Sequence, residues 1–307
     1  MASLISQFVG HGTQKNWLLE RAAKKELPSS IIFQGPQGVG KKTLAQALLQ
    51  VLNCKQSELS CGQCSNCKRS LEEKNELIHF IEPEDKKSIG VDQIRELHKI
   101  LSLRTMHEAR MVIIDPADKL TNQSANALLK VLEEAPEKTY FILITEQIRS
   151  LLPTIRSRSH MLKFSTLSPS ELAQFQAFDE VSLTWSGGRL QMAMDLQEKE
   201  HVDQLNDSLQ FLYSLICEMP QDWKKKAPWF FANNERAREF NFNIWNQALE
   251  KRLYKADVDL NWLPEDSARI SFIHEKIEFL KKDILANVDK LLAIENFYYQ
   301  LKPAKLT

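Results

Sequence analysis

A glycine-rich segment with two adjacent lysines, residues 35–43, directly follows the apolar run 30–34. An apolar strand, a glycine-rich turn and a helix start in this order are typical of a loop that binds nucleotide phosphates. The glycines let backbone N–H groups curl around phosphate oxygens, and the N-terminus of the helix adds partial positive charge. The candidate nucleotide-binding residues of this loop are Gly35, Gly38, Gly40, Lys41, Lys42 and Thr43.

The end of this loop departs from the pattern G-x-x-x-x-G-K-[ST], because Lys42 stands where Ser or Thr is expected. Lys41 would reach the phosphates as a point charge, but the missing hydroxyl would have held Mg²⁺. Thr43 comes one residue later, which on a helix turns its side chain about 100° away from the metal. We therefore expect a loop that can bind ATP or ADP but is poorly suited to Mg²⁺.

A second acidic element, Asp115 followed by Pro116, comes directly after the apolar run 111–114. In phosphate-loop ATPases an aspartate here supports Mg²⁺, and a following glutamate polarises the attacking water. Pro116 has neither a carboxylate nor an N–H, and we interpret the nearby Asp118 as a helix-start or solvated carboxylate. Lys42 and Pro116 together predict a site that does not hydrolyse nucleotide.

Four of the five cysteines lie close together in the sequence, with metal-ligand spacing. Two C-x-x-C steps preceded by a fourth cysteine can wrap four thiolates around Zn²⁺ in a closed, structural site. An iron–sulfur cluster is the rival, although the proline that follows the last cysteine in such motifs is absent, and free thiols remain the simplest alternative. We interpret the fifth, Cys217, as a buried small hydrophobe. The candidate zinc ligands are Cys54, Cys61, Cys64 and Cys67.

The composition is that of an ordinary soluble protein: 307 residues, 43% apolar and 26% charged, with 40 basic and 40 acidic side chains. Zero formal net charge argues against strong stand-alone binding to nucleic acid, which needs a basic surface. No apolar run is long enough to span a membrane, and the N-terminus lacks the pattern of a secretory signal. We therefore expect a cytoplasmic protein without membrane contact.

Strands and helices alternate through the first half of the chain. The expected strands are 30–34, 77–81, 110–115, 140–145 and 160–164; the expected helices are 14–27, 43–52, 89–101 and 122–134, the last capped by Thr121. Continuous apolar strands that alternate with helices predict a parallel sheet covered on both faces. Residues 1–165 should therefore form an α/β nucleotide-binding domain.

The second half of the chain reads as helical throughout. Ser168, Pro169 and Glu171 form a capping-box pattern at the start of a small helical segment, 166–205, which is interrupted at Gly187 and Gly188. Residues 206–307 follow as amphipathic helices. In the clearest of them apolar residues recur every three or four positions between 270 and 291, and we interpret that face as bundle packing rather than as a partner surface.

Five segments of the chain together resemble a known family, the bacterial DNA polymerase III clamp-loader subunits of the AAA+ class. They are the loop 35–41, the cysteine cluster after the loop's helix, and the segments 91–97, 126–136 and 152–159. The resemblance covers residues 1–165; the C-terminal half matches in length and helical character only. The degraded loop, Pro116 and the length make the chain most similar to the delta-prime branch.

The resemblance implies a fold and roles for further residues. It implies an AAA+ α/β P-loop domain with a zinc module (1–165), a helical lid (166–205) and an all-α collar (206–307). Arg158 would be an arginine finger that acts in trans, although Ser159 replaces the family's cysteine beside it. Thr145 would sense the γ-phosphate. Arg189 only loosely resembles the second sensor arginine.

The resemblance also implies partners: tau/gamma and delta subunits in a hetero-oligomeric ring, and through that ring the sliding clamp and primer–template DNA. We expect an accessory subunit of a DNA-directed DNA polymerase whose own ATPase activity is absent or very weak. Two alternatives stay open. One is an ATP-hydrolysing tau/gamma-like motor subunit, and the other is a zinc-stabilised adaptor unrelated to replication.

Overall fold

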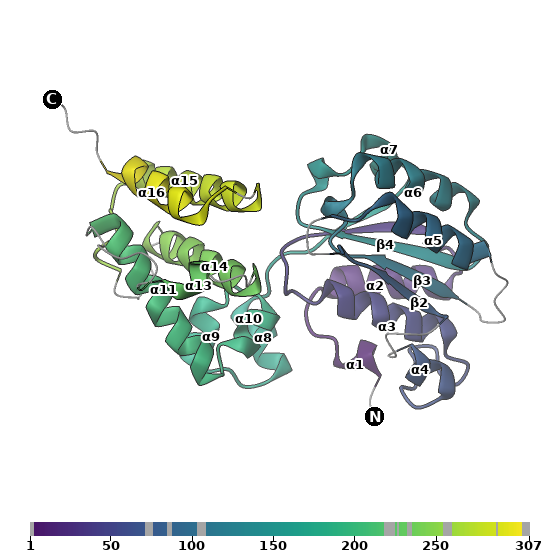
Figure 1. Ribbon diagram of the computed structural model, residues 1–307. Coiled ribbons are helices and arrows are strands. Elements are labelled where there is room, and N and C mark those ends of the chain that lie inside the picture. Colours follow the sequence, from purple (N-terminus) through teal and green to yellow (C-terminus); the bar gives the residue numbers. More distant parts are fainter. Residues whose placement is uncertain are drawn as a thin grey trace. The chain divides into compact units, whose positions relative to one another are not determined.

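The computed structural model describes residues 3–70, 76–84, 88–102, 109–217, 225, 227–231, 235–253, 260–286 and 288–302. The chain divides into two compact units (Figure 1). Unit 1 comprises residues 1–178 and 188–191, and unit 2 comprises residues 179–187 and 192–307. The lid and collar boundaries expected from the sequence remain predictions, and the predicted collar includes segments outside the described residues.

Unit 1 is built on a five-stranded sheet in the order β2-β3-β4-β1-β5. All four strand pairings are parallel, which confirms the predicted parallel sheet. The apolar residues 111–114 of β3 are all buried, as predicted, and so is Arg110 at its start. The strands are β1 (Ser30–Gln34), β2 (Ile78–Ile81), β3 (Arg110–Ile114), β4 (Thr139–Thr145) and β5 (His160–Lys163).

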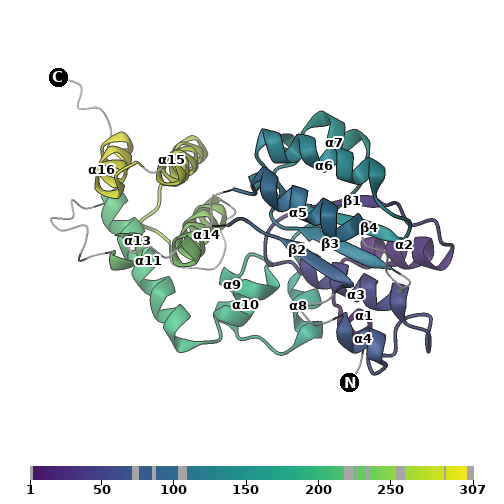
Figure 2. The ribbon, with the colours of Figure 1, turned by 45° about the vertical axis from the view of Figure 1, so that its right-hand side comes forward.

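Helices cover both faces of this sheet, as Figures 1 and 2 show. On one face α1 (Leu4–Gln7), α2 (Gly12–Ala23) and α3 (Lys41–Asn53) share an apolar cluster with alternate strand residues. On the other face α5 (Val91–Ser102), α6 (Asn122–Glu134) and α7 (Pro153–Ser157) share a second cluster with the intervening strand residues. Because side chains alternate along a strand, β1, β3 and β4 each contribute to both layers.

The sequence-based helix ends are close to the observed ones, with one instructive exception. The helix expected over residues 14–27 ends at Ala23, because Lys24 caps it and Lys25 takes a left-handed conformation with φ of 57°. Two predicted caps are confirmed. Thr121 accepts the N–H of Ser124, and the Ser168 capping box starts α8 (Pro169–Phe175).

Parallel strands place their carboxyl ends at one edge of the sheet, and the candidate nucleotide residues follow those ends. The loop follows β1, Asp115 follows β3, and Thr145 is the last residue of β4. Gln34 is in register with Thr145, and Ile81 with Ile114. This is the edge at which ligands bind in open α/β sheets.

Every regular element described in unit 2 is helical. A buried aromatic cluster around Trp245, Phe211 and Phe230 forms its core, and the Trp245 Nε1–H donates to the Ser208 carbonyl at 3.1 Å. Four apolar residues of α15 are buried in this core: Ile270, Ile273, Ile277 and Leu280. The helices are α9 (Glu180–Trp185), α10 (Leu190–Asp195, whose first two residues belong to unit 1), α11 (Lys199–Cys217), α13 (Pro228–Phe231), α14 (Glu235–Leu253), α15 (Ser267–Leu285) and α16 (Lys290–Leu301).

One residue of α11 departs from expectation. Cys217 is exposed rather than buried, because it is the last residue of α11 and lies beyond the helix's buried face, which ends at Leu215. Across the described ranges no helix is long and apolar enough to cross a membrane.

Candidate functional site

Two glycines of the loop are required by their surroundings. A Cβ on Gly35 would lie 2.3 Å from the carbonyl oxygen of Phe164, so no larger residue fits there. Gly40 is the N-cap of α3 with φ of 94°, a left-handed conformation that favours glycine, and the Phe8 ring lies against it. The loop therefore turns tightly into the N-terminus of α3, as the sequence predicts.

Lys41 is buried and binds the loop's own backbone. Its Nζ donates to the carbonyl oxygens of Gly35 at 2.7 Å and Pro36 at 2.5 Å. Burial lowers the pKa of Lys41, while the carboxylates of Glu146 and Asp115 act in the opposite direction. The ammonium therefore lies at the loop, where its hydrogen bonds to the Gly35 and Pro36 carbonyls could be exchanged for bonds to phosphate oxygens.

Glu146 is a site residue that the sequence analysis missed. Its Oε1 accepts the backbone N–H of Gln37 at 2.5 Å, so a carboxylate already lies on one donor of the phosphate-binding loop. The contact shows that the loop attracts anions. It also means that a phosphate would have to displace Glu146 from this N–H. No sequence signal links the two residues, which are 109 positions apart.

The ammonium group of Lys42 lies near the carboxyl ends of β2 and β3. Its Nζ lies 2.6 Å from Glu82 Oε1 and 4.4 Å from the centre of the Phe80 ring. Burial raises the pKa of Asp115, while the nearby positive charge of Lys42 lowers it. These carboxylates therefore face lysine ammonium groups, and no hydroxyl stands at position 42. Mg²⁺ does not fit this set of residues.

Thr145 and Asp118 are brought together by the fold. The Thr145 hydroxyl donates to Asp118 Oδ1 at 2.9 Å and accepts the N–H of Gln147 at 3.0 Å. Asp118 lies in a short 3-10 turn after β3. The sequence analysis placed Asp118 outside the site, whereas the structure makes it the partner of the expected γ-phosphate sensor.

Arg189 lies beside the loop, at the point where residues 188–191 return to unit 1. Its Cβ is 3.6 Å from where a Cβ on Gly38 would be, and the Gln191 N–H donates to the Gly38 carbonyl at 3.1 Å. Within the described part of the chain its buried Nε has no hydrogen-bond partner. Its charge contributes to the lowered pKa of Lys41, although burial is the larger cause. Two cations therefore flank the loop, which favours an anion between them.

The four-cysteine cluster forms a site that fits zinc. The sulfur atoms of Cys54, Cys61, Cys64 and Cys67 all lie within 4.8 Å of one another. Backbone N–H groups from Gln63 and Cys64 lower the pKa of Cys61 to about 6, while burial raises that of Cys67 to about 12. Four convergent thiols with N–H donors to sulfur match the donor set of a structural zinc site.

The cluster is attached to α3 at several points. Cys54 is the C-cap of α3, and the Asn66 Nδ2 donates to the Asn53 carbonyl at 3.0 Å. Gln50 Nε2 donates to the Cys67 carbonyl at 2.9 Å. Cys64 is the N-cap of α4 (Ser65–Arg69). A metal held by these thiols would therefore tie α4 and its flanking turns to the end of α3.

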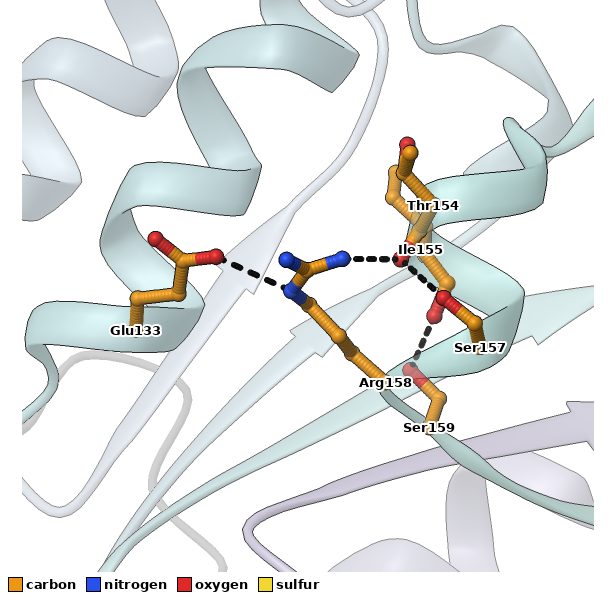
Figure 3. Close-up of polar contacts among 6 residues, drawn as sticks. All are labelled: Glu133, Thr154, Ile155, Ser157, Arg158 and Ser159. Carbon is orange, nitrogen blue, oxygen red and sulfur yellow. Dashed lines mark hydrogen bonds and ion pairs between the residues drawn. The ribbon is translucent and has the colours of Figure 1, made fainter.

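Arg158 lies apart from the loop, at the C-cap of α7, with a side chain that is 46% exposed. Figure 3 shows its guanidinium between two acceptors. The Nε donates to Glu133 Oε1 at 2.9 Å, and Nη1 donates to the Thr154 carbonyl at 3.3 Å. The neighbouring Ser159 hydroxyl bonds to the Ile155 carbonyl at 2.9 Å and to the Ser30 hydroxyl at 2.7 Å, which fixes the turn that carries Arg158.

Comparison with known proteins gives this geometry a context. The family model described as "DNA polymerase III, delta subunit" matches residues 10–168. The chain is 34% identical over 149 residues to the DNA polymerase III subunit delta' of Haemophilus influenzae, which covers 48% of this chain and 45% of the relative. It is 41% identical over 133 residues to the delta' subunit of Yersinia pestis, covering 42% of this chain and 39% of the relative.

Gamma/tau subunits also match part of the chain. The DNA polymerase III subunit gamma/tau of Mycobacterium tuberculosis is 37% identical over 141 residues, covering 45% of this chain and 24% of the relative. These matches therefore span less than half the length of the curated relatives. Among solved structures, a DNA polymerase III gamma subunit-related protein of Thermotoga maritima has a TM-score of 0.55 at 16% identity, covering 92% of this chain and 98% of that one. That likeness shows a shared fold.

Proposed function

This chain belongs to the DNA polymerase III delta subunit family, and from that membership we propose that it is the delta-prime-type subunit of a bacterial clamp loader. Relatives named delta' and gamma/tau support this role. In the proposal the subunit joins tau/gamma and delta subunits in a ring that loads the sliding clamp onto primer–template DNA. In this proposal residues 166–205 form the lid and residues 206–307 form the collar.

The observation that carries the proposal is the exposed, oriented guanidinium of Arg158. An arginine that enters a neighbour's active site can stabilise the charge that develops on the γ-phosphate during hydrolysis. Arg158 has what such a role needs, because its turn is fixed by Ser159 while its side chain remains 46% exposed. We propose that it acts on ATP bound by an adjacent tau/gamma subunit.

The chain's own loop supports a subunit that does not hydrolyse ATP. Glu146 lies on the Gln37 N–H, Lys42 pairs with Glu82, and Pro116 follows Asp115 without a carboxylate. When bound, a nucleotide would supply the phosphates for the loop N–H groups, Lys41 and Arg189 to hold. We propose that this site holds ATP or ADP without turnover, or serves only to shape the domain.

The alternative is an ATP-hydrolysing motor of the tau/gamma type, which the gamma/tau relatives at 37% identity favour. Steady-state ATP turnover by the isolated chain distinguishes the two. The delta-prime proposal expects no turnover above background, with or without Mg²⁺. Turnover that disappears in Lys41→Ala would establish the motor instead.

The direct test is reconstitution with tau/gamma, delta, the clamp and primed DNA. We expect a defined complex that loads clamps, and we expect Arg158→Ala to reduce its DNA-dependent ATP turnover strongly, since arginine fingers contribute about 10³–10⁵ in rate. Arg156→Ala is the matched control, because Arg156 lies on the same short helix and is also exposed. Equal turnover of the Arg158→Ala complex and the unmodified complex would exclude the finger.

A further inference from the structure

The guanidinium of Arg158 is held from two sides by its own subunit. Its Nε binds the carboxylate of Glu133, which lies near the end of α6, and its Nη1 binds the Thr154 carbonyl of α7. Figure 3 shows these acceptors on opposite sides of the side chain. Among the described residues, none bonds to Nη2.

This division of donors suits the recognition of a phosphate. Arginine binds phosphate oxygens through a planar fork of N–H groups. Anchoring Nε and one hydrogen of Nη1 fixes the plane of the guanidinium and leaves the Nη2 donors for a ligand. A side chain that is already oriented loses less conformational freedom when it engages a transition state.

The position of Glu133 at the end of α6 makes a nearby positive charge favourable. It lies in the last turn of α6, a helix end at which a negative charge is unfavourable and which contains no basic residue of its own. Arg158, 25 residues later, supplies the positive charge. The side chains of Arg158 and Glu133 are 46% and 55% exposed. Their ion pair therefore adds little to the stability of the fold.

From this geometry we propose that Glu133 is a positioning residue that holds Arg158 in the orientation needed to reach a neighbouring subunit's phosphate. The inference rests on the proposed finger role of Arg158. It assigns a role in the partner's ATP hydrolysis to a carboxylate that does not touch the nucleotide itself.

The adjacent carboxylate provides a matched control. Glu134 comes next on α6 but binds His98 Nε2 at 3.1 Å and lies 3.9 Å from Lys130 Nζ, without a bond to Arg158. Glu134→Ala therefore removes a similar charge from the same helix end and leaves the Arg158 contacts in place.

The test is ATP turnover by the reconstituted complex carrying Glu133→Ala, Glu133→Gln, Glu134→Ala or Arg158→Ala. We expect Glu133→Ala to lower kcat about tenfold, the scale of loss that follows from misplacing a catalytic group. KM for ATP, subunit assembly and the melting temperature of the chain should stay unchanged. Glu133→Gln, whose amide oxygen can still accept the Nε–H, should restore most of the rate, and Glu134→Ala should keep all of it.

The double variant Glu133→Ala/Arg158→Ala separates positioning from an independent effect. If Glu133 acts only through Arg158, the double variant has the rate of Arg158→Ala alone. An unchanged rate in Glu133→Ala while Arg158→Ala is impaired overturns the inference and leaves the finger in place. A faster rate in Glu133→Ala would make the carboxylate a restraint and also overturn it. An unchanged rate in Arg158→Ala would exclude the arginine-finger role of Arg158, and the positioning role of Glu133 with it.

Discussion

At the scale of single residues, Lys42 changes what the glycine-rich loop can hold. Its ammonium group pairs with Glu82. Burial raises the pKa of Asp115, and the positive charge of Lys42 opposes that rise. Where a magnesium-binding loop would place a hydroxyl, this chain places a fixed cation. The loop's affinity for nucleotide should therefore be independent of divalent metal.

Replacing Lys42 by Thr should restore a dependence on metal. We expect unmodified protein to bind a fluorescent ADP equally in Mg²⁺ and in EDTA, and Lys42→Thr to bind about tenfold more tightly in Mg²⁺ than in EDTA, a difference of about 1.4 kcal/mol. Fluorescence anisotropy measures both. Lys42→Met, which removes the charge without adding a hydroxyl, should gain no metal dependence. A strong Mg²⁺ effect on the unmodified protein would contradict the prediction.

Glu146 should oppose the binding of phosphate. Its carboxylate bonds to the Gln37 N–H and would repel an incoming anion. Glu146→Gln should raise the affinity for ADP or pyrophosphate by about tenfold, or about 1.4 kcal/mol, as measured by titration calorimetry. Glu137→Gln, an exposed carboxylate in the loop before β4, serves as the control. Weaker binding by Glu146→Gln would indicate that the carboxylate shapes the loop instead of blocking it.

The ionised carboxylate of Asp115 should lower the stability of the folded protein at neutral pH. Burial raises its pKa, so the folded protein holds this proton more tightly than the unfolded chain. The resulting stabilisation is present in full below the unfolded pKa and is lost as the pH rises through the folded pKa. Asp115→Asn should therefore raise the melting temperature at pH 7, by about 2–4 °C if the gain is about 1 kcal/mol.

The pH dependence identifies the cause of that gain. The difference between Asp115→Asn and the unmodified protein should shrink as the pH falls toward the unfolded pKa, because both side chains are then neutral. Thermal melts across this range measure it, with the exposed Asp92→Asn as a reference. A difference that stays constant with pH would assign the effect to packing.

At the scale of elements, the cysteine cluster should stabilise the end of α3. Cys54 caps this helix, and Gln50 and Asn53 are hydrogen-bonded to Cys67 and Asn66 of α4. Purified protein should contain one zinc per chain, and removing it should lower the melting temperature of unit 1 on the order of 5–10 °C. Metal analysis and thermal melts provide the two measurements.

A matched pair of cysteine variants tests this prediction. Cys61→Ser removes a ligand and should abolish stoichiometric zinc, whereas Cys217→Ser, in α11, should leave the zinc content unchanged. Less than half a zinc per chain in protein purified without chelators would contradict the structural-zinc interpretation.

The sheet of unit 1 could be predicted because short apolar runs in the sequence mark its strands. Runs such as 111–114 are continuously apolar, and every residue of β3 is indeed buried. The end of α2 was not, since a left-handed Lys25 leaves no mark on helical periodicity. Cys217 was misjudged because residue type predicts burial only on average, and its position at the end of α11 exposes it.

Part of the candidate site could likewise be predicted from the sequence, and part could not. The loop, the cysteines and Asp115 follow from residue type and spacing. The contacts of Glu146 with Gln37, Asp118 with Thr145 and Glu133 with Arg158 join residues 109, 27 and 25 positions apart. Such pairs depend on how strands and helices are placed in space, and no local pattern specifies them.

At the scale of the whole molecule, the two units have separate cores. Strand and helix residues form two apolar clusters in unit 1, and an aromatic cluster around Trp245 forms the core of unit 2. Differential scanning calorimetry should therefore resolve two transitions, because each unit can unfold with its own core. Chelation of zinc should move only the transition of unit 1, which contains the four-cysteine cluster. A single transition that shifts as a whole would show that the units unfold together.

Ser159 also has a consequence for chemical durability. Thiols can be oxidised stepwise to sulfenic and sulfonic acids, whereas a serine hydroxyl does not enter that chemistry. Here the residue beside Arg158 carries a hydroxyl with two hydrogen bonds, and the five cysteines are Cys217 and those of the four-cysteine cluster. An oxidant that attacks the four-cysteine cluster would therefore meet no thiol at the position next to Arg158. The turn that carries Arg158 should keep its shape under oxidative conditions that would alter a relative with cysteine at this position.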